Sequence, residues 1–263
     1  MARPAVTIPS TFALDWTALP TTDGNVGGVA FKPLSADPAT GAATLLLHLP
    51  PGWHDPQLDW HPATEESFKL AGWSRSGDRA SGTPSYIFRP PGLLHGPTLA
   101  EDTLGATFLI RMDGELRIHH VPWDAPGVAQ DAAVAPEYAA GRERLVWVPD
   151  IEAVERRPAP ADGPWAGALV RELRSDPGSG GGLVLLDLPP GWSGEGSRGR
   201  GEAEELVLAG ALRAGGGSGL GSAGPVELTR WGYACRPAGA PAGRYSTGSG
   251  ATLACWWTAA ELG

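Results

Sequence analysis

Short apolar runs bounded by glycine and proline dominate this chain. TLLLHL (44–49) and LVLLDL (183–188) have the length of buried β-strands. Further runs of this kind are SYIFRP (85–90), ATFLIRM (106–112), LRIHHV (116–121) and LVWVP (145–149). Turn signals such as DPATG, PPG and MDGE separate the runs, and helical periodicity is at most weak, in 131–144. The pattern predicts an all-β protein made of antiparallel sandwiches or barrels.

The pattern occurs twice. Residues 32–53 and 171–192 align at a constant offset of 139 with eleven of 22 positions identical, including the whole LPPGW. With small gaps, EESFKLAG (65–72) matches EELVLAG (204–210), FRPPGLLHGP (88–97) matches CRPAGAPAGR, and GATFLI matches GATLAC. The chain is therefore two copies of one module. We expect an N-terminal barrel in 1–123, a linker in 124–143 and a C-terminal barrel in 144–263.

Composition excludes several classes of protein. The chain has 263 residues, of which 42% are hydrophobic, enough for packed cores. A net charge of −9 without a basic face argues against nucleic-acid binding. No apolar run approaches the roughly 18 residues of a membrane span, and the first 20 residues lack a signal-peptide pattern. We expect a cytoplasmic bacterial protein whose two cysteines, Cys235 and Cys255, are buried thiols.

Candidate chemistry is concentrated in the first copy, which holds all six histidines. In DWHPATEES, Asp59, His61 and Glu65 share odd parity, so on an extended strand their side chains would point into one barrel interior. Burying these groups without partners would cost several kcal/mol, and a divalent metal would offset that cost. His95, delivered by the turn RPPGLLHGP, is the expected fourth member.

These segments resemble the motifs of the cupin superfamily. Its first motif is G-x5-H-x-H-x3,4-E-x6-G and its second is G-x5-P-x-G-x2-H-x3-N. HPATEESFKLAG and YIFRPPGLLHGP are similar to ChrR-type cupins in particular, so the resemblance implies a bicupin of two jelly-roll barrels. Three positions depart from the motifs: Asp59 replaces the first histidine, Gly52 is one residue too far away, and Leu99 replaces the asparagine. His54 is a possible substitute ligand.

The second copy lacks most of these candidate metal ligands. At the offset of 139, Asp59 corresponds to Arg198, His61 to Arg200 and Glu65 to Glu204, while the gapped second motif places Ala242 at the position of His95. A carboxylate beside arginines is a poor site for a transition metal, and an Arg–Glu ion pair would satisfy these groups instead. We expect the second barrel to be degenerate and metal-free.

The resemblance implies a metal-dependent enzyme, most readily a dioxygenase, with isomerase, lyase or cyclase chemistry as alternatives. One divalent ion per chain (Fe, Mn, Ni, Cu or Zn) is expected on Asp59, His61, Glu65 and His95. Glu65 and His61 are the candidate catalytic residues, with Glu65 as a general base when it is not bound to the ion. The expected partner is a small apolar, aromatic or enolic molecule. The chain could form a homodimer. Two alternative functions remain, a ChrR-like metal sensor without catalysis and a pair of metal-free binding barrels.

Overall fold

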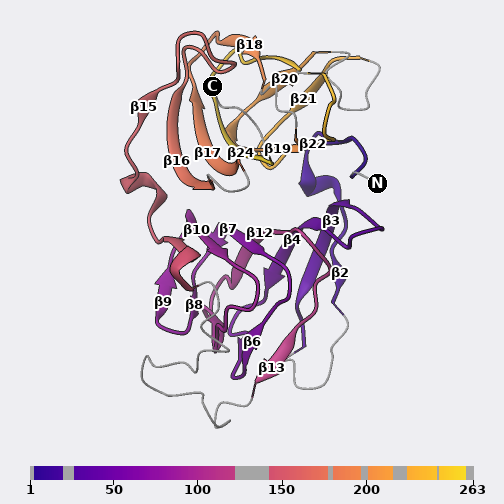
Figure 1. Ribbon diagram of the computed structural model, residues 1–263, viewed down its shortest axis with the longest axis vertical. Coiled ribbons are helices and arrows are strands. Elements are labelled where there is room, and N and C mark those ends of the chain that lie inside the picture. Colours follow the sequence, from indigo (N-terminus) through magenta and orange to yellow (C-terminus); the bar gives the residue numbers. More distant parts are fainter. Residues whose placement is uncertain are drawn as a thin grey trace. The chain divides into compact units, whose positions relative to one another are not determined.

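A computed structural model describes residues 3–19, 27–121, 142–176, 180–196, 201–215, 224–241 and 243–258. It divides the chain into two compact units. We call Trp16–Glu152 the N-terminal barrel and the unit formed by Met1–Asp15 and Ala153–Gly263 the C-terminal barrel. Each unit consists of short antiparallel strands, which are labelled in Figure 1. The all-β architecture of two copies that the sequence pattern and the repeat predict, with the jelly-roll barrels that the cupin resemblance implies, is therefore confirmed.

The N-terminal barrel has a seven-stranded sheet in the order β14-β10-β7-β12-β4-β3-β2, opposed by a four-stranded sheet, β5-β11-β8-β9, and a pair, β13-β6. The strands are β2 (Thr17–Ala18), β3 (Ala30–Ala36), β4 (Ala43–Leu49), β5 (His54–Asp55), β6 (Leu58–Trp60), β7 (Glu65–Gly72), β8 (Ser74–Ser76), β9 (Arg79–Ser81), β10 (Ser85–Arg89), β11 (Thr98–Ala100), β12 (Ala106–Met112), β13 (His119–Val121) and β14 (Val146–Val148).

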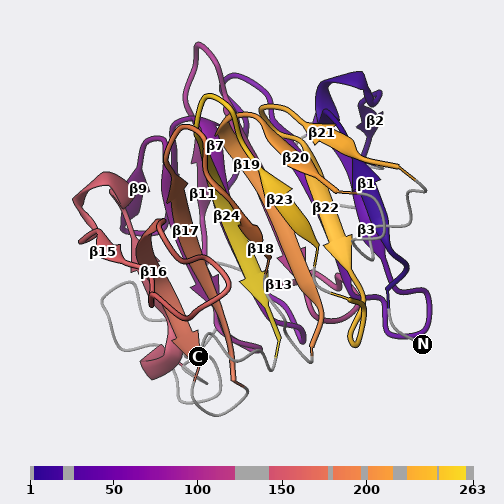
Figure 2. The ribbon, with the colours of Figure 1, turned by 90° about the horizontal axis from the view of Figure 1, so that it is seen from above.

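The C-terminal barrel repeats this plan with a seven-stranded sheet, β1-β22-β19-β24-β17-β16-β15, and a four-stranded sheet, β18-β23-β20-β21. Its strands are β1 (Val6–Ile8), β15 (Arg157–Pro158), β16 (Leu169–Asp176), β17 (Gly181–Leu188), β18 (Ser193–Glu195), β19 (Ala203–Gly210), β20 (Leu212–Ala214), β21 (Val226–Leu228), β22 (Tyr233–Arg236), β23 (Arg244–Ser246) and β24 (Ala251–Trp257). Figure 2 shows β17, β24, β19, β22 and β1 side by side in the larger sheet.

The units differ from the expected domain boundaries at both ends. Strand β1, at the start of the chain, pairs with β22 in the C-terminal barrel, with Val6 opposite Cys235. Strand β14, beyond the expected linker, pairs with β10 in the N-terminal barrel, with Trp147 opposite Ile87. An edge strand is placed by its hydrogen-bonding partner, and a three-residue apolar run does not reveal which sheet edge accepts it. Most of the expected linker, 124–141, lies outside the described residues.

In the part of the chain that the structure describes, the other regular elements are single 3-10 turns, η1 (Thr11–Ala13), η3 (Arg142–Arg144) and η4 (Ile151–Ala153). Within the described ranges no helix is long and apolar enough to cross a membrane. Cys235 and Cys255 are buried free thiols, as expected.

Equivalent glycines end the central strand of each barrel. Gly72 on β7 and Gly210 on β19 have φ values of 78° and 73°, in the left-handed region that glycine tolerates. A Cβ on either residue would overlap a carbonyl oxygen of the facing strand, that of Gly105 or of Gly250 respectively. Beside each glycine the ladder to the neighbouring strand shifts register. The LAG shared by the two copies therefore marks a bulge at which two backbones approach closely.

Gly72→Ala should destabilise the protein by at least about 2 kcal/mol, because the new Cβ meets both an unfavourable φ and the Gly105 backbone. Thermal or urea unfolding measures this loss. Gly82→Ala is the matched control, since nothing lies within 4 Å of a Cβ built there, and it should change stability by less than about 0.5 kcal/mol. Equal effects of the two substitutions would contradict the close approach.

Candidate metal centre

A pair of backbone hydrogen bonds joins the two segments that carry the candidate ligands. The N–H of Asp59 donates to the carbonyl of His95, and the N–H of His95 donates back to Asp59, both at 2.9 Å. The N–H of Gly92 also donates to the carbonyl of His61, at 2.8 Å. The turn after β10 is thus fixed against the end of β6, and the side chains of both segments meet inside the N-terminal barrel.

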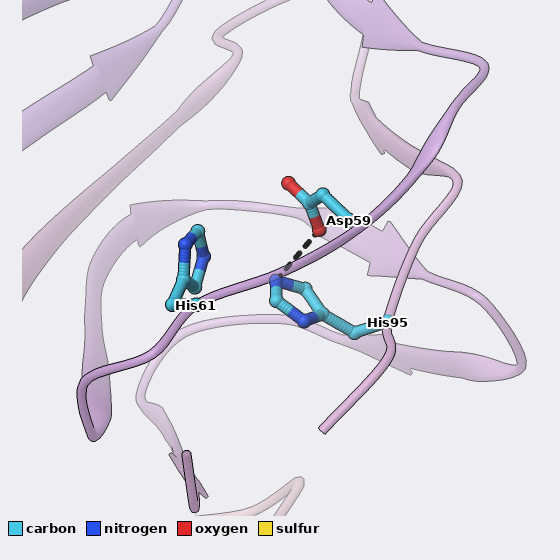
Figure 3. A group of neighbouring side chains, drawn as sticks. All are labelled: Asp59, His61 and His95. Carbon is cyan, nitrogen blue, oxygen red and sulfur yellow. Dashed lines mark ion pairs between the residues drawn. The ribbon is translucent and has the colours of Figure 1, made fainter. Parts of the chain in front are cut away.

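The structure brings Asp59, His61 and His95 together, as shown in Figure 3. One potential ligand atom from each of these residues lies within 4.8 Å of the other two. Asp59 Oδ1 is 2.9 Å from His95 Nε2, and the two imidazole centroids are 5.1 Å apart. Within the described part of the chain, no other set of histidine, cysteine, aspartate and glutamate side chains is grouped in this way.

Glu65 lies beside this group. Its Oε2 is 3.1 Å from His61 Nε2 and 3.9 Å from His95 Nε2. Its other oxygen, Oε1, pairs with the guanidinium of Arg89 and accepts a hydrogen bond of 2.5 Å from Ser67. Glu65 therefore faces both imidazoles with one oxygen, while the other is held by two partners.

Asp59, His61 and Glu65 do not lie on one extended strand, so the parity argument placed them correctly for the wrong reason. Strand β6 ends at Trp60 and β7 begins at Glu65, so His61 lies in the turn between them. The turn, rather than alternation along a strand, directs the His61 imidazole toward Glu65.

The two histidines have a common orientation. Nδ1 of His61 is 3.2 Å from the carbonyl oxygen of Arg117, and Nδ1 of His95 is 3.1 Å from that of Leu93. A carbonyl oxygen only accepts, so each Nδ1 carries a proton and donates it. Each Nε2 is therefore the atom directed at the carboxylates, and in the neutral imidazole it is the nitrogen with a free lone pair.

The site residues shift one another's pKa values. Burial favours the neutral form of Glu65, but the Arg89 guanidinium and the His61 imidazole outweigh it and hold the pKa of Glu65 well below its usual range. Burial alone would raise the pKa of Asp59, but the contact with His95 outweighs burial, so the pKa of Asp59 is lowered. Burial lowers the pKa of His61, but its hydrogen bond and charge interaction with Glu65 leave that pKa raised. Both carboxylates are therefore ionised at neutral pH.

His54 does not join the group. It is exposed on β5, opposite Leu99 on β11, while its buried neighbour Asp55 lines the barrel pocket. The other histidines are also apart from the group: His48 contacts the hydroxyl of Thr107 at 3.0 Å, and the His119 ring stacks on Trp60. Of the candidates, Asp59, His61, Glu65 and His95 converge, and their ligation of a metal stays a prediction.

A pocket of about 190 Å³ opens from this group into the barrel. One wall is apolar and comes mainly from β4 and β12, including Leu47, Leu49, Phe108, Ile110 and Met112. The polar part of the lining adjoins it in the same sheet, with Ser67 and Lys69 on β7 and Ser85 and Arg89 on β10, and continues with Ser74 and Ser81 on the smaller sheet. The group thus lies at a cavity with an apolar and a polar part.

The strand register corrects the predicted counterpart of Glu65 in the C-terminal barrel. Met112 faces Glu65, and the equivalent residue of the shared GAT segment, Trp257, faces Ala203. Glu204 therefore corresponds to Glu66, because the one-residue gap between the copies lies inside this strand. The two pairs behave alike: the hydroxyl of Tyr86 donates to Glu66 at 2.6 Å, and that of Tyr233 donates to Glu204 at 2.5 Å.

The interior carboxylate of the C-terminal barrel is instead Glu205, which pairs with Arg236. Arg236 occupies the same position in its copy as Arg89, and Glu205 corresponds by register to Ser67. Around it the core is filled by large side chains, with Trp165 stacked on both Trp192 and Tyr245. Arg198, Arg200 and Ala242, the predicted replacements for the other ligands, lie outside the described residues.

Comparison with known proteins agrees with this geometry. A family model described as the ChrR cupin-like domain matches residues 7–112. The whole architecture matches structures of proteins with two cupin barrels. The chain has the bicupin fold.

Solved structures cover both barrels of this bicupin. A candidate dioxygenase from Nostoc punctiforme superposes with a TM-score of 0.77 at 18% identity, over 97% of this chain and 83% of that one. Protein Ylba from E. coli gives 0.62 at 11% identity over 97% and 91%, and a variant of Bacillus subtilis oxalate decarboxylase gives 0.60 at 14% over 97% and 77%. At these identities the likeness shows the fold. No curated protein matches the sequence significantly.

Sequence reasoning missed Arg89, although a signal was present. The FRPPG of the first copy and the CRPAG of the second keep an arginine at the same position, and in both barrels it pairs with a buried glutamate. A cation next to a proposed metal ligand argues against a cation site at first sight. Here it neutralises one oxygen of Glu65 and leaves the other facing the imidazoles.

Arg89→Met should lower the free energy of unfolding of the metal-free protein at pH 7 by about 3–5 kcal/mol, because it leaves Glu65 buried and charged without its cation. Urea unfolding measures the loss. Adding Glu65→Gln should recover part of it by removing the uncompensated charge. Arg117→Met, which breaks an exposed pair with Glu115, should cost less than about 1 kcal/mol.

The same pair gives the wild type a defined acid response. Because the pKa of Glu65 is depressed in the folded state, its stabilising contribution is complete above the ordinary value of 4.5 and is lost as the pH falls through the folded value. The difference between wild type and Arg89→Met should therefore shrink in acid. A difference that does not change between pH 7 and pH 3 would contradict the ion pair.

Proposed function

We propose that this bicupin is a metal-dependent enzyme that oxidises a small organic substrate, with dioxygenase-type chemistry as the leading reaction. The observation that carries the proposal is the position of Asp59, His61 and His95: their ligand atoms converge on a pocket with a large apolar wall. A site that only stabilised the fold would be closed by protein groups on all sides.

The donor set fits a divalent transition metal. Two imidazole Nε2 atoms and carboxylate oxygens of Asp59 and Glu65 form the mixed nitrogen and oxygen set that Fe, Mn, Ni, Cu or Zn accepts. The contacts of both Nδ1 atoms with carbonyl oxygens hold the rings in the orientation that a bound ion requires. An ion held there supplies Lewis-acid polarisation of a carbonyl or enol oxygen and, if redox-active, electrons for reaction with O2.

Two roles were left open for Glu65, and the structure favours one. A general base works best when its pKa is near the working pH, whereas Arg89 and His61 hold the pKa of Glu65 well below its usual range. Glu65 is therefore a weak base in this setting. Its Oε2 is better suited to binding a cation or to fixing the His61 ring than to removing a proton from a substrate.

The pocket restricts the substrate. Its volume of about 190 Å³ is below the range of roughly 300–1,000 Å³ typical of sites for drug-sized ligands, so the substrate is small. The wall formed by Leu47, Phe108 and Ile110 favours an apolar or aromatic body. These features fit the small aromatic or enolic molecule expected from the sequence.

Two structurally similar proteins and the family match bear on the reaction type. The structurally similar candidate dioxygenase favours oxidation, and the similar oxalate decarboxylase makes carbon–carbon lyase chemistry the alternative. A ChrR-like sensor without catalysis is the third reading, and the family match supports it. The open pocket argues against that reading, because a sensor site needs no room for a substrate.

Protein purified without chelator should contain about one divalent ion per chain, and the double variant His61→Ala, His95→Ala should contain almost none, because it removes both nitrogen donors. Elemental analysis measures the content. His54→Ala and His119→Ala are matched controls from the same barrel and should keep the ion. Wild-type content far below one, or content unchanged in the double variant, would overturn the metal proposal.

Oxygen uptake distinguishes the reaction types. With catechols, flavonols and β-diketones as test substrates, a dioxygenase should consume O2 in step with substrate, and turnover should stop without air. Turnover that is insensitive to anaerobiosis would point to lyase or cyclase chemistry. Metal-loaded protein that binds none of these compounds would favour the sensor.

A further inference from the structure

Lys69 is a buried cation that lines the same pocket at a distance from the Asp59–His61–His95 group. It lies on β7 four residues beyond Glu65 and on the same face, so the two Cα atoms are about 13 Å apart along the strand. Its side chain lines the pocket, and the residue is 2% exposed. The neighbouring strands place Ser85 and Phe108 directly opposite it.

The contacts of Lys69 are with neutral groups. Its Nζ donates to the carbonyl oxygen of Ser81 at 2.5 Å and to the Ser81 hydroxyl at 2.9 Å, and Ser85 donates to the same hydroxyl at 2.9 Å. Among the residues the structure describes, no carboxylate oxygen lies within 4.0 Å of Nζ. By contrast, Arg89 in this interior and Arg236 in the other barrel each pair directly with a glutamate.

A protonated Lys69 amine has no carboxylate in contact with it among the described residues to balance its charge. Burial lowers the pKa of Lys69 to about 8, Arg89 adds to that effect, and Glu101 opposes it from a longer distance. The amine is thus still largely protonated at pH 7. An ammonium group has three N–H donors, and Ser81 accounts for two hydrogen bonds. A buried charge is stabilised by a partner of opposite sign, and here the pocket is the open direction from which one can come.

We infer that Lys69 binds the carboxylate of the substrate, so that the molecule lies along the pocket with its opposite end at the Asp59–His61–His95 group. The inference rests on the proposed function for the role of that opposite end. Phe108, whose ring centre is 5.5 Å from Nζ, lies beside the amine, and Ile87, opposite Ser67, lies between the amine and Glu65. Both line the pocket and suit an apolar or aromatic body. The substrate class is therefore a small carboxylic acid with an apolar body.

Benzoate and its uncharged analogue benzamide test this site in metal-free protein, with affinities measured by calorimetry. Wild type should bind benzoate at least tenfold more tightly than benzamide. Lys69→Met keeps the length of the side chain and removes its charge, so it should weaken benzoate at least tenfold and leave benzamide unchanged. Lys32 is the other lysine of the chain, and Lys32→Met should leave benzoate binding as it is.

An equal affinity of wild type for the two probes would overturn the inference, as would benzoate binding that survives Lys69→Met. If Lys69→Met does not fold, the wild type still decides. Methylating its two lysines with a 13C label gives separate NMR signals, and benzoate should shift that of Lys69 and not that of Lys32. A shift confined to Lys32, or none, would contradict the site.

Metal content separates this inference from the proposed function. Lys69→Met should keep the ion of the wild type, because Lys69 touches none of the proposed ligands. A wild type without metal that still selects benzoate through Lys69 would overturn the proposed function and leave the carboxylate site standing. A metal-loaded wild type that binds benzoate and benzamide equally would overturn the carboxylate site and leave the proposed function standing.

Discussion

The ion pair between Glu65 and Arg89 is the interaction on which the functional end of the N-terminal barrel depends. A carboxylate buried inside a β-barrel is tolerable only if its charge is balanced and its oxygens have partners. Arg89, directly opposite on the neighbouring strand, provides both for one oxygen. The second oxygen then faces His61 and His95, and the backbone bridge between Asp59 and His95 adds the other carboxylate.

The C-terminal barrel contains the same arginine in a different setting. Arg236 pairs with Glu205, two positions along the strand from the equivalent of Glu65, and Ala203 occupies the position where a ligand would be needed. Aromatic side chains fill much of the interior, where Trp165 stacks on both Trp192 and Tyr245. One fold thus balances a buried arginine in two ways, and only the arrangement in the N-terminal barrel directs carboxylate oxygen at imidazole nitrogen.

The sequence predicted the large features because they leave regular signals. The repeat between residues 32–53 and 171–192 predicted two copies, and the short apolar runs predicted strands. The convergence of Asp59, His61, Glu65 and His95 was predicted from residue type and from the cupin resemblance. The exchange of β1 and β14 between units was not predictable, since backbone pairing at a sheet edge carries little information about side chains.

The error at Glu204 has a physical cause that applies to any strand. Successive side chains alternate between faces, so a one-residue gap moves every following residue to the other side. EESFKLAG and EELVLAG differ by one residue, and a constant offset therefore paired an inward glutamate with an outward one. The bulges beside Gly72 and Gly210 fix the correct alignment of the two strands. The left-handed φ values of these glycines become visible only in the structure.

The charges of Asp59, His61, Glu65 and Arg89 allow the group to hold together without a cation and would let it accept one. The two carboxylates and the guanidinium sum to −1, so a proton on His61 brings these four side chains to zero. The raised pKa of His61 reflects that state, in which a proton lies between the imidazole and the Glu65 carboxylate. A divalent cation at the proposed site would displace that proton and change the sum to +1. The carboxylates would then balance the ion in place of the proton, and the barrel would have one unit of charge to accommodate.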